Sequence, residues 1–309
     1  MKVVSMFDGI SCGRIALERA GINVEAYEAF EINKASIRIS KDNWDDIVYH
    51  GDVTECDFKQ FIGYDLLLGG SPCKTVSSIA NIYVKDGEYG VNGNGESRLF
   101  WEFVRALRVV KPKYFLFENV ASMKKHDRDI ITEALGVEPV LINSSQFSAQ
   151  HRKRFYWTNI PFKIDLNKRY VNATLQDCLE ESVDDRYYLT QGTFDYVTRE
   201  RKKSGKMEID RTIAKPIVAS SWSAHRADSD NYVSTDYRPD GRTNVRKLTP
   251  LECERLQTIP DNYTSGVLDK DRYEAIGNGW TVDVIAHILM GLHNVNDQFC
   301  DKCVQQEVI

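Results

Sequence analysis

The chain has 309 residues, of which 42% are hydrophobic, 28% charged and 11% aromatic, a composition that excludes long disorder, collagen-like repeats and low complexity. Its formal net charge is −5, a sign that on average disfavours a nucleic-acid partner. No apolar run approaches the roughly 18 residues of a membrane span, and residues 1–7 are too short for a secretory signal, so we expect an intracellular, cytoplasmic protein.

Short apolar runs and helical patterns alternate along the first half of the chain. Runs of β-branched or apolar residues predict buried strands at residues 2–7, 24–30, 47–50, 64–68, 114–117 and 139–143. Apolar residues at helical spacing predict helices at residues 13–20, 34–43, 97–110 and 129–135. This alternation predicts an α/β fold with a doubly wound, mostly parallel sheet that is covered by helices on both faces.

The middle of the chain is irregular and basic. Residues 83–96 are rich in Gly and Asn and lack periodicity, which predicts a long functional loop. After residue 160 we expect short strands, such as residues 216–220, and no long helix. Residues 150–250 hold 19 Lys and Arg against 14 Asp and Glu, whereas the rest of the chain holds 21 against 31. A solvated surface and a nucleic-acid partner both explain this excess, and charge alone favours the solvated surface.

Helical patterns return near the end of the chain. Residues 251–257 follow Thr249 and Pro250, which suit the N-cap and the first helical position. Residues 281–292 are apolar along most of their length and predict a helix packed on the sheet. We therefore expect one domain from residues 1–160 and 246–293, an inserted module of residues 161–245 and a tail of residues 294–309.

Seven cysteines at irregular spacing are unlike a disulfide framework, and we expect most of them to be reduced. Cys300 and Cys303 form one C-x-x-C pair without a second pair or a clear His partner, so metal binding there is a minor possibility. Cys73 stands apart because of its neighbours.

The first three predicted strands end in residues that suit a nucleoside. Residues 7–13, Phe-Asp-Gly-Ile-Ser-Cys-Gly, follow the first strand and open a helix, where glycines let a ligand approach backbone N–H groups. Glu31 follows the second strand, where an acid suits ribose hydroxyls, and Asp52 follows the third. Any one acid is more often a helix cap, but acids after successive strands favour a nucleoside-containing cofactor.

Reactive side chains follow the next strands. The fourth strand ends in Gly-Gly-Ser-Pro-Cys73, a turn at which a thiolate nucleophile can be stabilised. Glu118 ends the fifth strand, and Arg152 and Arg154 follow the sixth. Because the strands of such a sheet deliver their ends to one crevice, we expect the thiol, the carboxyl group and the arginines to converge there.

Six segments resemble, in order, the motifs of the C5-cytosine DNA methyltransferase family. They are residues 7–9 (Phe-Asp-Gly), 70–73 (Gly-Ser-Pro-Cys), 117–120 (Phe-Glu-Asn-Val), 150–154 (Gln-x-Arg-x-Arg), 248–263 (Leu-Thr-Pro to Tyr) and 277–282 (Gly-Asn-Gly-Trp-Thr-Val). The resemblance spans residues 1–159 and 246–292. The forms Phe-Asp-Gly and Ser-Pro-Cys look most like the vertebrate de novo branch, whereas the chain length suggests a bacterial or phage enzyme.

The resemblance implies a Rossmann-like methyltransferase fold and a reaction. Methyl transfer from S-adenosylmethionine to C5 of cytosine would begin with addition of Cys73 to C6, because C5 alone is a poor nucleophile. Glu118 would bind or protonate N3, and Arg154, with Arg152 close by, would lie near O2. The base would be flipped out of double-stranded DNA, and no metal would be required.

The resemblance also assigns binding residues. Around S-adenosylmethionine it places Phe7, Asp8, Gly9, Ile10, Gly13, Glu31, Ile32, Asp52, Val53, Gly70, Pro72, Asn278, Gly279 and Val282. Against DNA we expect Ser77, Ser78 and Ile79 of the loop after Cys73, and Arg201, Lys202, Lys203, Arg226, Arg238 and Arg242 of the basic module.

Two alternatives remain. The family's tRNA-methylating branch uses the same chemistry, but it usually carries a Cys-Phe-Thr segment that this sequence lacks. A catalytically silent DNA-binding member is disfavoured because all four predicted catalytic residues are present. A companion restriction endonuclease and a homodimer are both compatible with the sequence, which indicates neither, and the recognition site cannot be read from it.

Overall fold

The computed structural model describes residues 1–77, 89–199, 207–222, 225–227 and 229–293. A seven-stranded sheet has the order β3-β2-β1-β4-β5-β7-β6, and a separate three-stranded sheet has the order β8-β10-β9. The strands of the large sheet are β1 (Lys2–Met6), β2 (Ala26–Phe30), β3 (Ile47–Tyr49), β4 (Leu66–Gly69), β5 (Tyr114–Val120), β6 (Val140–Asn143) and β7 (Lys153–Thr158).

The large sheet confirms the predicted α/β class and the six predicted strands. Strands β1 to β5 pair in parallel, whereas β7 runs antiparallel to both β5 and β6. The sequence analysis missed β7 because it begins with Lys153 and Arg154, whose charges interrupt the apolar pattern of a buried strand.

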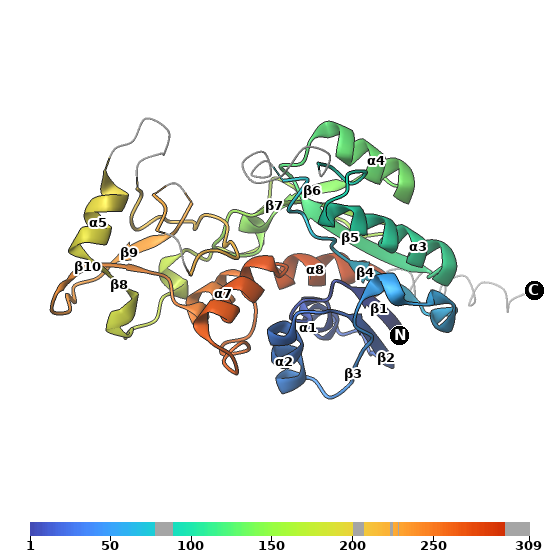
Figure 1. Cartoon of the computed structure of the whole chain (residues 1–309), viewed down its shortest axis with the longest axis horizontal. Helices are drawn as coiled ribbons and strands as arrows, with labels where there is room; N and C mark the ends of the chain where they lie inside the picture. Colours follow the sequence, from blue (N-terminus) through green and yellow to red (C-terminus); the bar gives the residue numbers. More distant parts are fainter. Residues whose placement is uncertain (78–88, 200–206, 223–224, 228, 294–309) are drawn as a thin grey trace, which may run out of the picture.

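Helices cover both faces of the large sheet (Figure 1). The helices of this part of the chain are α1 (Cys12–Arg19), α2 (Lys34–Asn43), α3 (Phe100–Val110), α4 (Lys125–Leu135), α6 (Pro250–Leu256), α7 (Asp269–Asn278) and α8 (Val282–Leu289). Short 3-10 helices are η1 (Val53–Glu55), η2 (Phe58–Phe61), η4 (Glu96–Leu99), η5 (Ser144–Gln146), η6 (Gln176–Cys178) and η7 (Asp185–Tyr187).

Alternate residues of the central strands enter two different cores. Val3 of β1 packs with residues of α1 and α8, whereas Val4 packs with Phe100 and Phe103 of α3. This division follows from the two-residue repeat of a strand, which sends neighbouring side chains to opposite faces. Since both faces are covered, the central strands are apolar almost throughout, as the sequence pattern indicated.

The chain after residue 246 contains one helix cap that was predicted and one helix that was not. Thr249 caps α6 through the backbone N–H of Glu252, whose side chain bonds back to Thr249, and Pro250 takes the first helical position. Helix α7 was not predicted, because its first turns, Asp-Lys-Asp-Arg, carry no apolar stripe. The stretch Asp269–His293 has the length and hydropathy of a membrane span, but 72% of its apolar window is buried inside the fold.

The inserted module (residues 161–245) lies to one side of the large sheet (Figure 1). It holds β8 (Tyr188–Thr190), α5 (Gln191–Thr198), β9 (Tyr232–Ser234) and β10 (Arg242–Lys247). Among the described residues of the module, a small core is formed by the buried side chains of Leu189, Val197, Met207, Tyr232 and Val245. The predicted strand at residues 216–220 was wrong, because Ile217 forms its backbone hydrogen bonds with the side chains of Gln150 and Arg152.

Buried carboxylates join the module to the sheet domain. Glu252 is fully buried and accepts two hydrogen bonds from Arg246, at 2.7 and 2.8 Å, and one from the backbone N–H of Glu180, at 2.9 Å. Arg246 lies on β10 directly after the module, Glu252 lies on α6, and Glu180 lies inside the module. A bidentate pair of this kind holds the three segments in one arrangement.

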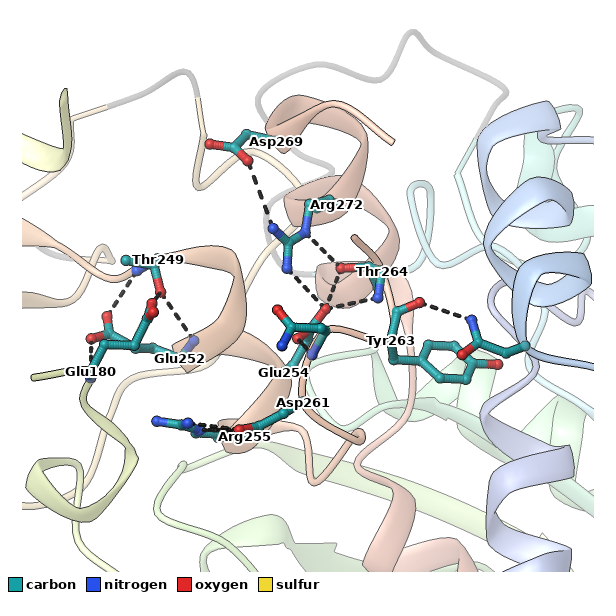
Figure 2. Close-up of polar contacts among 12 residues, drawn as sticks. Glu180, Thr249, Glu252, Glu254, Arg255, Asp261, Tyr263, Thr264, Asp269 and Arg272 are labelled. Atoms are coloured by element: carbon teal, nitrogen blue, oxygen red, sulfur yellow. Dashed lines mark hydrogen bonds and ion pairs between the residues drawn. The ribbon is translucent and has the colours of Figure 1, made fainter. Parts of the chain in front are cut away.

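A second carboxylate on α6, Glu254, fixes the chain between α6 and α7 (Figure 2). It accepts hydrogen bonds from the backbone N–H groups of Asn262 and Thr264, at 2.8 and 2.9 Å, and from the guanidinium of Arg272, at 3.1 Å. Because Arg272 lies on α7, its hydrogen bond to Glu254 ties α7 to α6. Helix α7 in turn brings residues 274–280 to the carboxyl ends of the strands.

Candidate active site

A cavity of about 340 Å³ lies at the carboxyl ends of β1, β4 and β5, beside the junction of α7 and α8. All four predicted catalytic residues line it: Cys73, Glu118, Arg152 and Arg154. It is also lined by a subset of the predicted cofactor residues, namely Phe7, Asp8, Gly9, Glu31, Gly70, Pro72, Asn278 and Gly279. Residues from both ends of the chain therefore meet in one cavity.

The other predicted cofactor residues do not line this cavity. Ile10, Val53 and Val282 are buried in the cores, and Gly13 packs so closely on Leu68 that a Cβ there would lie 2.9 Å from its Cδ1 atom. Ile32 is 69% exposed, and Asp52 caps η1 through the N–H of Thr54. Contact of these residues with a cofactor stays a prediction.

Cys73 lies in a turn that is fixed on both sides. The Ser97 hydroxyl donates to the carbonyl oxygen of Pro72 at 2.9 Å and accepts from the N–H of Thr75 at 3.2 Å. The Asn119 amide donates to the carbonyl oxygen of Ser71 at 3.3 Å. Burial raises the pKa of the Cys73 thiol, and the nearby Arg154 charge opposes this rise. The turn thus holds a half-buried thiol next to a cation that favours the thiolate.

Two donors hold the Glu118 carboxylate. Arg154 Nε lies 2.7 Å from Oε1, and the Trp280 indole N–H donates to Oε2 at 3.1 Å. A Cβ at Gly70 would lie 3.0 Å from Oε2, so Gly70 leaves the space that the carboxylate occupies. The side chain of Glu118 is therefore held in one position in the cavity rather than free to rotate.

Arg152 immediately precedes β7 and Arg154 lies on it, and the two side chains contact different partners. Arg154 pairs with Glu118, whereas Arg152 is 5% exposed and donates to the backbone carbonyls of Ile217, Gly277 and Gly279 at 2.8, 2.9 and 3.0 Å. Burial, with the Arg154 charge as a second cause, lowers the pKa of Arg152 to about 10. Arg152 therefore remains positively charged near neutral pH.

Acids fix the turn after β1. Asp8 accepts hydrogen bonds from the hydroxyls of Ser5, Ser11 and Tyr27, at 2.5, 2.5 and 2.7 Å. Burial of the carboxyl group raises the pKa of Asp8 to about 6, although these three donors oppose the rise. Glu31 accepts from the N–H of Gly9 at 2.8 Å, which ties the end of β2 to the turn.

Several supporting residues were not found by sequence reasoning. The hydroxyl of Ser97, the amide of Asn119 and the indole of Trp280 each fix a predicted catalytic residue or its turn. Asn119 and Trp280 belong to quoted motifs, so their sequence positions were a usable signal. Ser97 lies 24 residues after Cys73, and no local pattern links the two.

The predicted DNA-binding residues are less well defined. Ser78, Ile79, Arg201, Lys202 and Lys203 lie outside the described residues, and the N–H of Ser77 donates to the carbonyl oxygen of Cys73 at 3.0 Å. In the module, Arg226 pairs with buried Asp230, Arg238 donates to the carbonyl oxygen of Arg242, and Arg242 donates to that of Tyr188. These three arginines are thus partly engaged within the module.

Two further expectations concern metals and cysteines. In the described part of the chain, no group of three or more His, Cys, Asp or Glu side chains could hold a metal ion. The five described cysteines, at positions 12, 56, 73, 178 and 253, are free thiols. Cys300 and Cys303 lie outside the described residues.

Comparisons with known proteins agree with this geometry. A family model described as C-5 cytosine-specific DNA methylase matches residues 1–294. The chain is 29% identical to the type II methyltransferase M1.ScrFI of Lactococcus lactis subsp. cremoris, over 92% of this chain and 76% of the relative. It is 28% identical to the type II methyltransferase M.HpaII of Haemophilus parainfluenzae, over 91% and 86%. The fold is similar to that of the Entamoeba histolytica methyltransferase EhMeth, with a TM-score of 0.75 and 20% identity over 95% and 98% of the two chains.

Proposed function

Because the chain belongs to the C-5 cytosine-specific DNA methylase family, we propose that it methylates C5 of a cytosine that is flipped out of double-stranded DNA. The observation that carries the proposal is the convergence of Cys73, Glu118 and Arg154 in one cavity. A nucleophile, a proton-handling carboxyl group and a cation are the three groups that attack at C6 of cytosine requires.

S-adenosylmethionine is the proposed cofactor. The cavity floor is formed by the turn after β1, and acids from two neighbouring strand ends, Asp8 and Glu31, line it. Such a floor suits a nucleoside with a cationic sulfonium group. The hydrogen bond from the N–H of Gly9 to Glu31 at 2.8 Å fixes the turn, and a fixed turn lowers the entropic cost of binding. When bound, the sulfonium supplies an electrophilic methyl group.

The chain's own residues would activate the base. The Cys73 thiolate forms a bond to C6, and the electron pair of the C5–C6 double bond moves toward C5 and the N3–O2 system. Glu118 binds or protonates N3, and Arg154 stabilises negative charge at O2. After C5 has received its methyl group, loss of the C5 proton restores the double bond and expels the Cys73 thiolate.

The inserted module would supply contacts to DNA. The hydrogen bond from Arg152, which lines the cavity, to Ile217 of the module supports this role, as does the excess of basic residues between residues 150 and 250. We propose that residues 1–160 and 246–293 form the catalytic domain and that residues 161–245 recognise the target. The type II relatives support a restriction–modification context with a companion endonuclease.

Labelled S-adenosylmethionine tests the proposal. Purified protein is incubated with mixed-sequence duplex DNA or with tRNA, and the product nucleosides are separated. We expect 5-methylcytosine from the duplex and none from tRNA. Label found only in tRNA would show that the substrate is tRNA and not DNA. Cofactor binding without transfer to either acceptor would indicate a silent family member.

A further inference from the structure

Arg152 contacts only backbone among its described side-chain hydrogen bonds, unlike its neighbour Arg154. Its Nη1 donates to the carbonyl oxygen of Ile217 at 2.8 Å, and its Nη2 donates to those of Gly277 and Gly279 at 2.9 and 3.0 Å. The guanidinium is planar, and its donors point in fixed directions. Three carbonyls on two of its nitrogens therefore fix the guanidinium relative to both segments that supply them.

The three carbonyls belong to two different parts of the molecule. Gly277 and Gly279 lie where α7 ends, and both line the cavity that we assign to the cofactor. Ile217 belongs to the inserted module. Arg152 therefore bridges the cavity wall and the module with a single buried charge.

Close packing strengthens the same bridge. A Cβ at Gly277 would lie 2.3 Å from the backbone nitrogen of Ala219 and 2.4 Å from the carbonyl carbon of Val218, so only glycine fits. On the other side, the N–H of Ile217 donates to Gln150 Oε1 at 2.7 Å. Residues 217–219 are thus held between the segment that precedes β7 and the end of α7, in close contact with Gly277.

We propose that Arg152 is a positioning residue that couples the cofactor side of the cavity to the module, and that it does not contact the cytosine. If residues 277–279 shift when the cofactor binds, Ile217 must follow, because the alternative leaves a buried charged donor without its acceptor. Trp222, 46% exposed, and Arg226 follow closely in the chain. Cofactor binding would therefore set the position of part of the DNA-facing surface.

The inference rests on the proposed function only for the identity of the cofactor. Hydrogen–deuterium exchange of the full chain, with and without S-adenosylhomocysteine, tests it. In the wild-type protein, we expect the product to slow exchange at least about fivefold both in residues 277–282 and in residues 217–222. Arg152→Lys keeps the positive charge but loses the planar guanidinium that bonds to all three carbonyls. In this variant, exchange should slow only in residues 277–282.

A second variant perturbs the same contact without changing Arg152. Gly277→Ala forces residues 218 and 219 away from α7 and should also abolish the effect on residues 217–222. Arg169→Lys is the matched control, because Arg169 likewise donates to two backbone carbonyls, those of Ser145 and Ala173, but does not line the cavity. It should behave like the wild-type protein.

The outcomes separate the two proposals. Slowing that is confined to residues 277–282 in the wild-type protein, or slowing in residues 217–222 that persists in Arg152→Lys, would overturn the coupling and leave the cofactor assignment intact. No product binding to the wild-type protein, measured by calorimetry, would overturn the cofactor assignment and the coupling with it.

Discussion

The cavity and the inserted module are built in different ways. Cys73 follows β4, Glu118 lies on β5 and Arg154 lies on β7, so the reactive groups are carried by the buried sheet. In its described part, the module has three short strands and a core of five buried side chains, and Arg242 donates a hydrogen bond to the module's own backbone. This fold therefore carries its proposed chemistry on the paired strands of the buried sheet and its proposed DNA contacts on less regular segments.

The largest expected effect concerns the cavity. Cys73→Ser removes the proposed nucleophile, so methyl transfer should fall by about 10⁴-fold or more, while binding of S-adenosylhomocysteine should not change. Single-turnover transfer and calorimetry measure the two quantities. Cys56→Ser, at a thiol outside the cavity, is the control and should keep full activity. Retained transfer by Cys73→Ser would remove the covalent step from the account.

The next effect concerns the junction between the two regions. Glu252→Gln leaves Arg246 buried without its counter-charge, so the free energy of unfolding should fall by about 3–5 kcal/mol. Urea unfolding measures this change. Asp129→Asn, at an exposed pair with Lys125, should leave the midpoint unchanged. Equal midpoints for both variants would show that the buried pair does not hold the junction together.

Asp8 predicts a pH dependence of the cavity floor. Its pKa rises from an ordinary 3.8 to about 6 on folding, so the folded protein binds this proton more tightly than the unfolded chain does. The stabilising contribution of the protonated Asp8 carboxyl group to the free energy of unfolding is complete below pH 3.8. It is lost as the pH rises to about 6, a change of about 3 kcal/mol.

Asp8→Asn should remove that dependence. The stability of the variant relative to the wild-type protein should therefore increase by about 3 kcal/mol between pH 4 and pH 7, as measured by urea unfolding at each pH. Asp46→Asn, at an exposed pair with Arg14, should show no such trend. A constant difference between Asp8→Asn and the wild-type protein would mean that the carboxyl group titrates normally.

The smallest expected effect concerns the module. Arg238 is exposed, and Arg238→Ala should lower the slope of log K against log salt for duplex binding by about 1. Fluorescence anisotropy at several salt concentrations measures the slope. Arg19→Ala, on the sheet domain, should leave it unchanged. A lower slope for Arg19→Ala and an unchanged slope for Arg238→Ala would place the DNA-binding surface on the sheet domain.

The sheet was predictable because burial on two faces leaves a continuous apolar run in each strand. The exceptions have physical causes. Strand β7 opens with two basic residues, and helix α7 opens with four charged ones, so neither has the apolar pattern of its class. Residues 216–220 look like a strand, but the side chains of Gln150 and Arg152, just before β7, satisfy the backbone groups of Ile217.

The candidate site was predictable where topology decides it. Residues that follow parallel strands must meet at one edge, and Cys73 and Glu118 do so. The partners that orient them are not encoded locally. Ser97 and Trp280 reach the site from distant segments, and the backbone contacts of Arg152 depend on a module that has no strong periodicity.

Covalent capture tests the central claim most directly. DNA copied with 5-fluorocytosine in place of cytosine is incubated with the protein and S-adenosylmethionine, because fluorine at C5 prevents the elimination that releases the enzyme. Mass spectrometry of the digested complex should then find the DNA adduct on the peptide that contains Cys73. Methylation of ordinary duplex DNA without such an adduct, or an adduct on another cysteine, would contradict the account.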